Sequence, residues 1–225
     1  SEADWVREGL AQLFEYENYG GITSMNLRTA LTSSRHALEE RFDTNDVAPE
    51  RYGNTFLFFY FLKQTCDADQ VWKNFFKIPA STNQGRDSVQ HVLRQLNSPV
   101  QECGDVKELM SKFIVSKLVN LKGGGMTSAL WPQLQPMSPM SAEARTLAGL
   151  SFTDQRKFLE ALPPFLGLKL PLGIWVPTLG PQVLSRLGIK IQVWQAGLPY
   201  PTLRDWEGER LPPTANSYLL LYKAR

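Results

Sequence analysis

Two glutamates near the end of the chain, Glu207 and Glu209, are separated by a single glycine. If this segment is extended, both carboxylates point to the same face, because side chains alternate along a strand. The pair precedes a proline stop and an apolar run over 217–222, which we expect to form the last strand. A carboxylate at the entry to a buried strand can be held over a ligand. This pair is therefore the leading candidate for chemistry in the sequence.

The segment that begins at Glu207 resembles the end of the mono-ADP-ribosyltransferase fold. There, a Glu-X-Glu is followed by an apolar pair, one or two prolines and a closing strand. Two further segments are similar to that family. Residues 16–28 look like its tyrosine-rich helix end and the helix that follows, and residues 150–153 look like its Ser-Thr-Ser strand.

This resemblance implies a role for each candidate residue. Glu209 would hydrogen-bond the nicotinamide ribose of NAD and stabilise the positive centre as nicotinamide leaves. Glu207 would orient or deprotonate the acceptor. Ser151 or Thr153 would hold Glu209 in place.

The resemblance also requires an arginine that grips the NAD diphosphate through a bidentate fork. Arg86 is the first candidate and Arg51 the second, although neither follows two apolar residues as the family's arginine does. The chain would then be an NAD-dependent transferase domain of a toxin or effector that modifies a protein target.

A second resemblance points to a binding protein. Residues 175–194 are similar to the helix and strand of ovarian-tumour (OTU) deubiquitinases, and residues 216–218 stand where those enzymes have Asn-His-Tyr. Ser217 replaces the histidine, and Met25 lies near the place of the nucleophilic cysteine. Thiol catalysis needs a cysteine beside a histidine. This resemblance therefore implies a catalytically inactive relative, that is, a non-enzymatic protein-interaction domain.

The chain has two cysteines and two histidines, and their spacing matches no zinc motif. We therefore expect no metal cofactor. Cys66 and Cys103 can form one disulfide or remain free, and the sequence leaves both states open.

Composition narrows the partner classes. The 225 residues are 43% hydrophobic and 20% charged, as is usual for a folded soluble protein, and the net charge is only +2 with no basic block. We therefore expect a protein partner and no nucleic acid. The longest apolar run, 56–62, is far shorter than a membrane span. No charged-then-apolar leader opens the sequence, so we expect that any signal peptide is absent or already removed. We expect a soluble protein, and the sequence leaves its location open, with secretion or delivery as part of a larger protein among the alternatives.

Hydrophobic periodicity predicts a helical first half and a mixed second half. Expected helices cover 3–17, 25–42, 56–76 with an interruption at 67–69, 87–96, 105–121, 154–162 and 182–187. Expected strands cover 174–176, 189–194 and 217–222, and a loop is expected over 43–53.

The predicted fold class is α+β, with a helical N-terminal half and a β-containing C-terminal half. We expect a mainly helical region over 1–121, a Gly/Pro/Met-rich loop or linker over 122–141 and a β-containing region over 142–225. The loop contains Trp131, and an aromatic residue in such a loop can mark a partner site.

Overall fold

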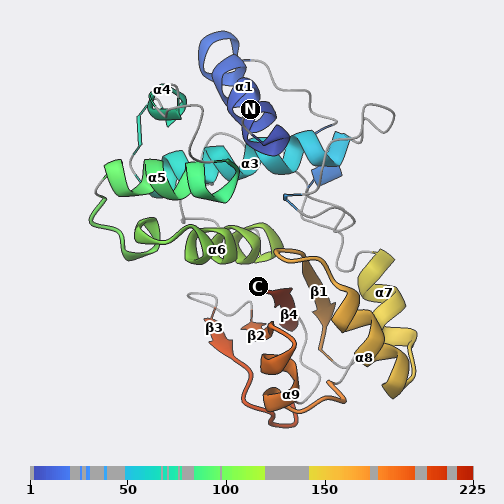
Figure 1. Cartoon of the computed structure of the whole chain (residues 1–225). Coiled ribbons are helices and arrows are strands. Elements are labelled where there is room, and N and C mark those ends of the chain that lie inside the picture. Colours follow the sequence, from blue (N-terminus) through green and yellow to red (C-terminus); the bar gives the residue numbers. More distant parts are fainter. Residues whose placement is uncertain are drawn as a thin grey trace. The chain divides into compact units, whose positions relative to one another are not determined.

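The computed structural model divides the chain into two compact units (Figure 1). The N-terminal unit runs from Ser1 to Pro136 and the C-terminal unit from Met137 to Arg225. The structure describes residues 3–20, 26, 29–30, 38–39, 49–66, 68–69, 71–75, 77, 84–96, 98–119, 142–172, 177–195, 202–211 and 217–224. The predicted α+β class is confirmed, because helices dominate the first half and a four-stranded antiparallel sheet lies in the second.

The described part of the N-terminal unit is helical. Its elements are α1 (Asp4–Tyr19), α3 (Pro49–Thr65), α4 (Val71–Phe75), α5 (Arg86–Leu96), the 3-10 helix η1 (Gln101–Gly104) and α6 (Val106–Val119). The helices expected over 3–17, 87–96 and 105–121 are confirmed within a few residues, and so is the interruption after Thr65. The range 25–42 lies largely outside the described residues, and the predicted loop over 122–141, including Trp131, lies entirely outside them.

Helix α3 is the centre of this unit. Every residue from Phe56 to Leu62 is buried, so the helix contacts other elements all round rather than along one stripe. Helix α1 lies close to it at Gly9, where an added Cβ would stand 2.5 Å from a ring carbon of Phe59. Trp5 stacks on the same phenylalanine at 5.8 Å between ring centroids. A glycine on α1 therefore makes room for an aromatic core.

The loop expected over 43–53 is wrong from Pro49 onward, where α3 already begins. Proline is well suited to a first helical position, because its missing N–H would have no partner there. Gly53 lies within this first part of α3, and an added Cβ would meet the backbone oxygen of Asn26 at 2.1 Å. The glycine that suggests a loop in the sequence therefore serves close packing against a second segment.

The C-terminal unit contains three helices and one sheet. Its elements are α7 (Ala142–Gly149), α8 (Phe152–Ala161), β1 (Gly167–Pro171), α9 (Pro181–Arg186), β2 (Ile189–Gln195), β3 (Thr202–Asp205) and β4 (Ser217–Lys223). The strands are antiparallel in the order β1-β4-β2-β3. The predicted strands over 189–194 and 217–222 are the two inner strands, whereas 174–176 lies outside the described residues.

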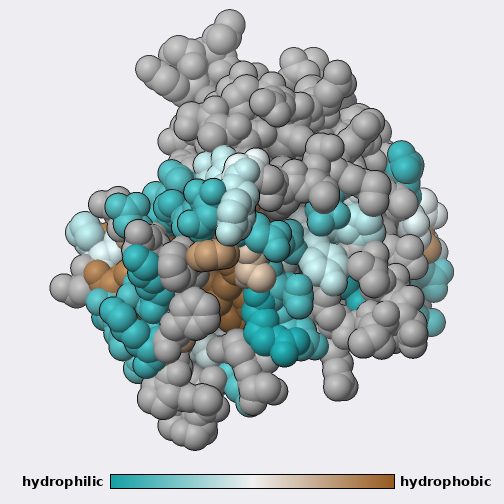
Figure 2. Space-filling view, turned by 90° about the horizontal axis from the view of Figure 1, so that it is seen from above, coloured by the Kyte–Doolittle hydropathy of each residue, from teal (hydrophilic) through white to brown (hydrophobic). Residues whose placement is uncertain are grey.

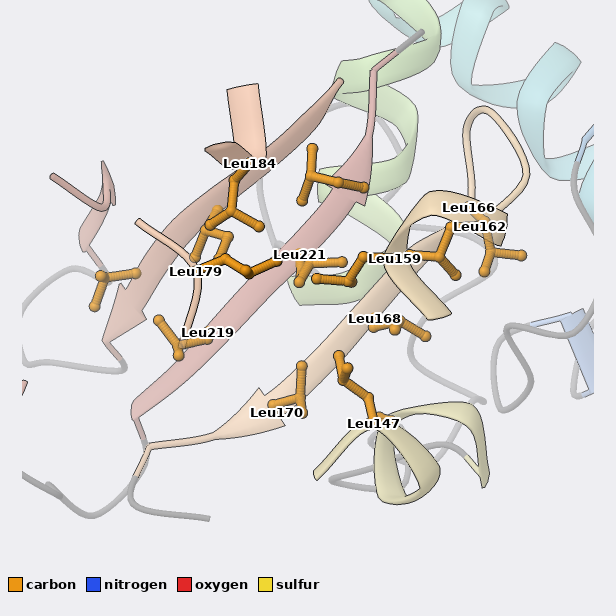
Figure 3. Close-up of a cluster of buried hydrophobic side chains, with 14 of the residues drawn as sticks. Leu147, Leu159, Leu162, Leu166, Leu168, Leu170, Leu179, Leu184, Leu219 and Leu221 are labelled. Atoms are coloured by element: carbon orange, nitrogen blue, oxygen red, sulfur yellow. The ribbon is translucent and has the colours of Figure 1, made fainter. Parts of the chain in front are cut away.

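One face of this sheet carries the core. Leu168, Leu219 and Ile191 alternate with more polar residues and are buried with their neighbours on the same face. Leucines from the helices, such as Leu147 of α7 and Leu159 of α8, contact this face (Figure 3). The unit is thus a sheet whose leucine face is covered by helices.

The face of the molecule seen from above presents hydrophilic side chains around a small hydrophobic area (Figure 2). Within the described ranges, no helix combines the length and the apolar character that crossing a membrane requires.

Candidate functional site

The two glutamates of the leading motif lie in a turn that follows β3. Gly208 has a φ of +99°, a left-handed conformation that glycine adopts without strain. The chain therefore reverses between Glu207 and Glu209, and an oxygen of the Glu209 carboxylate accepts the backbone N–H of Glu207 at 2.9 Å. The expectation that both carboxylates point to one face of an extended strand is wrong for this segment.

The Glu209 carboxylate also forms an ion pair with Arg204 of β3. Slight burial opposes ionisation, but the hydrogen bond from Arg204 and the backbone hydrogen bonds outweigh it and lower the pKa of Glu209. The backbone oxygen of the same residue accepts the indole N–H of Trp206 at 3.0 Å. Glu209 therefore closes the turn through three contacts, whereas Glu207 is exposed.

The residues expected to support Glu209 have other contacts. Ser151 is the N-cap of α8, where its hydroxyl accepts the backbone N–H of Asp154 and donates to that residue's carboxylate at 2.6 Å. The strand expected over 150–153 is therefore wrong, since α8 begins at Phe152. Thr153 is exposed in the first turn of that helix. The contacts of Glu209 within the described residues include neither hydroxyl.

The two candidate arginines belong to helices of the N-terminal unit. Arg86 is the first residue of α5 and forms an ion pair of 2.7 Å with Glu39. Burial raises the pKa of Glu39, and the Arg86 guanidinium only partly opposes it. Arg51 is buried in α3. Neither arginine lies on a strand, so the strand-borne arginine of the transferase pattern is not reproduced at these positions.

A hollow of about 160 Å³ lies beside the Glu207–Glu209 turn. Its apolar wall comes from α9 and β2, and Asp205 and Trp206 line it from the end of β3. The turn itself contacts α9, because an added Cβ on Gly208 would lie 3.0 Å from Pro181. The hollow therefore adjoins both the acidic turn and the end of β3.

Strand β3 is an edge of the described sheet, and all four of its residues are exposed. The Trp206 N–H donates to the Ile191 oxygen at 3.0 Å. In an antiparallel ladder, every second pair of opposite residues is joined by backbone hydrogen bonds. Arg204 and Val193 are therefore also such a hydrogen-bonded pair. The backbone N–H and C=O groups of Leu203 and Asp205 consequently point away from β2. The Asp205 oxygen accepts the Arg204 guanidinium at 3.3 Å. The sheet therefore presents the N–H and C=O of Leu203 and the N–H of Asp205 to a further strand.

The side chains along this edge continue a row that crosses the sheet. Tyr218, Trp194 and Leu203 lie opposite one another on β4, β2 and β3. The Trp194 and Tyr218 rings are 5.4 Å apart, and the Lys169 ammonium lies over both at 5.0 and 4.3 Å. Burial lowers the pKa of this lysine. Leu203, which is 40% exposed, ends the row at the edge.

The sequence analysis missed β3. Thr202-Leu203-Arg204-Asp205 contains one β-branched residue and no buried one, so it carries no alternation of apolar and polar positions. An exposed edge strand lacks the apolar pattern that identifies inner strands. The preceding proline, Pro201, is its main sequence signal, because proline is commonly found next to the start of a strand or on an edge strand.

The cysteines are joined in one disulfide between Cys66, which directly follows α3, and Cys103 of η1. They are the chain's only two cysteines, so the disulfide leaves no thiol for nucleophilic catalysis. Among the described residues, no group of three His, Cys, Asp or Glu side chains is placed to hold a metal ion.

No family model, no curated protein and no solved structure matches this chain.

Proposed function

We propose that this chain is a non-enzymatic protein-interaction domain whose C-terminal sheet binds an extended segment of a partner protein along β3. One observation carries this proposal. The outward backbone groups of Leu203 and Asp205 lie on an exposed edge, and strand addition to such an edge is a common mode of peptide recognition. Main-chain hydrogen bonds would supply affinity, and the exposed side chains would supply selectivity.

The contacts of the acidic turn favour binding over catalysis. The Glu209 carboxylate is engaged by Arg204 and by the Glu207 amide, so it supports the end of β3. A catalytic carboxylate would instead be directed at a reacting group. The turn thereby fixes the conformation of the chain at the point where a docked strand would end.

The proposed binding mode also agrees with the resemblance to inactive deubiquitinase relatives. Helix α9 leads into β2 as in that resemblance, and Ser217, which stands where the family has its histidine, begins β4. Met25, near the expected place of the nucleophile, lies outside the described residues. With both cysteines in the disulfide, such a relative would bind without cleaving through a thiol.

The disulfide also bears on location. Disulfides form and persist in oxidising environments and are rare in the cytosol. The Cys66–Cys103 bridge therefore supports secretion, or delivery as part of a larger protein. Mass spectrometry of the protein isolated from its source, after blocking of free thiols, would test this location. Two blocked cysteines would contradict it.

The binding proposal is tested with displayed random peptides selected on the immobilised protein. The informative variant is Leu203→Pro, because it removes an outward N–H and leaves the β2 ladder intact. Leu203→Val is the matched control, since valine keeps that N–H. We expect the selected peptides to bind Leu203→Val as the wild type and Leu203→Pro about tenfold more weakly, from the lost hydrogen bond. Equal binding to both variants, or selection of no peptide, would contradict the proposal.

An NAD-dependent mono-ADP-ribosyltransferase is a second candidate, for one reason. Glu209 is bonded to an arginine, Arg204, and its turn adjoins a hollow that also contains the Ser185 hydroxyl. An arginine and a hydroxyl near the acidic pair are what the transferase resemblance requires. The hydroxyl and the arginine would then differ from the predicted Ser151, Thr153 and Arg86.

Labelled NAD and a cell lysate separate the two candidates. The transferase hypothesis predicts label on a protein with the wild type and with Glu15→Ala, but not with Glu209→Ala. Glu15 is a matched control because it belongs to the chain's other Glu-X-Glu and is exposed. Absence of transfer, together with an unchanged melting temperature in NAD, would sink the transferase hypothesis and leave the binding proposal intact.

A further inference from the structure

We propose that the segment bound along β3 presents an apolar side chain beside Leu203 and, two residues away, a basic side chain beside Asp205. This inference rests on the proposed function, because it names the chemistry of the partner at the same edge. It follows from the side chains that share one face of the sheet and from the registers available to a second copy.

Leu203 and Asp205 project from the same face, because they are two residues apart in a strand. They lie opposite Trp194 and Gln192 of β2. A strand added to the edge would place its own side chains next to this pair, at the spacing at which cross-strand neighbours interact. Two partner side chains, two residues apart, would therefore each face a side chain of different chemistry.

The position beside Leu203 favours an apolar residue. The row of Tyr218, Trp194 and Leu203 is aromatic and apolar, and it stops at a leucine that is 40% exposed. Aromatic and β-branched neighbours stabilise such rows. An apolar side chain of the partner would cover Leu203 and extend the row by one strand.

The position beside Asp205 favours a cation. Its carboxylate accepts the Gln192 amide at 2.8 Å, and within the described part of the chain it forms no ion pair. The neighbouring Arg204 pairs instead with Glu209. Burial and, after it, the charge of Asp205 raise the pKa of Tyr222 to about 12.

A second copy of β3 does not supply the proposed partner chemistry. A two-fold axis between antiparallel copies would set Arg204 against Arg204 in one register and Asp205 against Asp205 in another, and like charges directly opposite destabilise a sheet. The register that sets Leu203 against Leu203 avoids both, but it sets Pro201, which has no basic side chain, against Asp205. The proposed partner is therefore a different segment, with a positive charge at the position beside Asp205.

The test uses displayed peptides in which every second residue is threonine. Two of the positions between the threonines, separated by one threonine, are randomised. For the wild type we expect enrichment of an apolar residue at one position. At the other, lysine and arginine should be enriched over aspartate and glutamate by about fivefold. Asp205→Asn, which keeps an oxygen for Gln192, should abolish the charge preference, and Asp205→Lys should reverse it.

Three outcomes would overturn the inference. If the wild type selects peptides that Leu203→Pro fails to bind, but without a charge preference, the partner chemistry is wrong and the binding edge stands. If no peptide depends on the Leu203 N–H, the proposed function fails as well. If sedimentation shows a dimer that Leu203→Pro dissociates, the occupant is a second copy of the chain.

Discussion

The two units bury their apolar side chains in different ways. In the N-terminal unit, α3 is buried on all sides from Phe56 to Leu62, and aromatic rings dominate its contacts. In the C-terminal unit, leucines cover one face of a sheet, and the sheet ends in an exposed strand, β3. A helix satisfies its own backbone, whereas a sheet leaves hydrogen-bonding groups free at its edge. The difference shows why binding through the backbone is to be sought in the second unit.

The largest effect is expected from the aromatic core of the first unit. Phe59→Ala should lower the free energy of unfolding by about 3–5 kcal/mol, because it removes a buried ring and leaves a cavity. Its ring contacts Trp5, Phe58 and Phe75. Phe14→Ala, at a residue of the same unit that is 37% exposed, is the control and should cost far less.

Hydrogen exchange would show which elements lose stability in Phe59→Ala. Protection should fall in α5 and α6 and should remain in β2 and β4, if the two cores are independent. An equal loss in both units would contradict the separation of the cores.

The disulfide allows a second test of whether the two units differ in stability. It links Cys66 and Cys103 across 37 residues of the N-terminal unit. Replacement of both cysteines by alanine should destabilise that unit by about 4 kcal/mol, chiefly because the unfolded chain gains freedom. The measurement is hydrogen exchange in α3 and in β4 at increasing urea concentration, which reports on each unit separately. Unchanged stability of the N-terminal unit would mean that the bridge is not a structural constraint.

The helices of the first unit were largely predictable because their signals are local. Apolar spacing placed α1, α5 and α6 within a few residues. The start of α3 was not predictable in this way, since Pro49 and Gly53 suggest a loop. Only the contact between Gly53 and the Asn26 backbone reveals why glycine is needed inside that helix.

The second unit was predicted less completely. The inner strands were found, β2 by its alternation of apolar and polar residues and β4 as an apolar run, whereas the edge strands β1 and β3 were missed. Helix α7 (Ala142–Gly149) was missed as well, because its eight residues carry few apolar marks.

The acidic motif was located correctly, but its geometry was not. The positive φ of Gly208 reverses the chain between Glu207 and Glu209. Glycine permits such a turn without dictating it, so composition alone does not indicate whether the segment is extended.

A pH effect is expected from Lys117 on α6. Burial lowers its pKa to about 8, despite the opposing charge of Glu50, and its ammonium donates to Asn54 at 2.6 Å. Between pH 8 and the usual lysine value near 10.5, the unfolded chain binds more protons than the folded one. The free energy of unfolding should therefore rise with pH in this window, by at most about 1.4 kcal/mol per pH unit. Below pH 8 both states are protonated and the effect is constant.

The matched pair for this prediction is Lys117→Met and Lys107→Met, the second at an exposed position of the same helix. Urea unfolding from pH 7 to pH 10 should show the rise in the wild type and in Lys107→Met. Lys117→Met should lack it, because the titrating group is gone. The same slope in Lys117→Met as in the wild type would assign the titration to another group.

The smallest effect is expected at the acidic turn. Glu209→Gln removes the charge that pairs with Arg204, and partly exposed pairs contribute less than about 1 kcal/mol. Because the folded-state pKa of Glu209 is lowered, this contribution is present above the usual glutamate value of 4.5 and is lost as the pH falls below it. Thermal unfolding at pH 7 and pH 3 should therefore separate wild type from Glu209→Gln only at pH 7.

Glu209→Gln also tests how the acidic turn contributes to peptide binding at β3. If the turn only supports the edge, Glu209→Gln should weaken the selected peptides slightly, because the edge strand retains its ladder with β2. A complete loss of binding with normal stability would instead place Glu209 in direct contact with the partner. The binding surface would then include the acidic turn as well as the edge of the sheet.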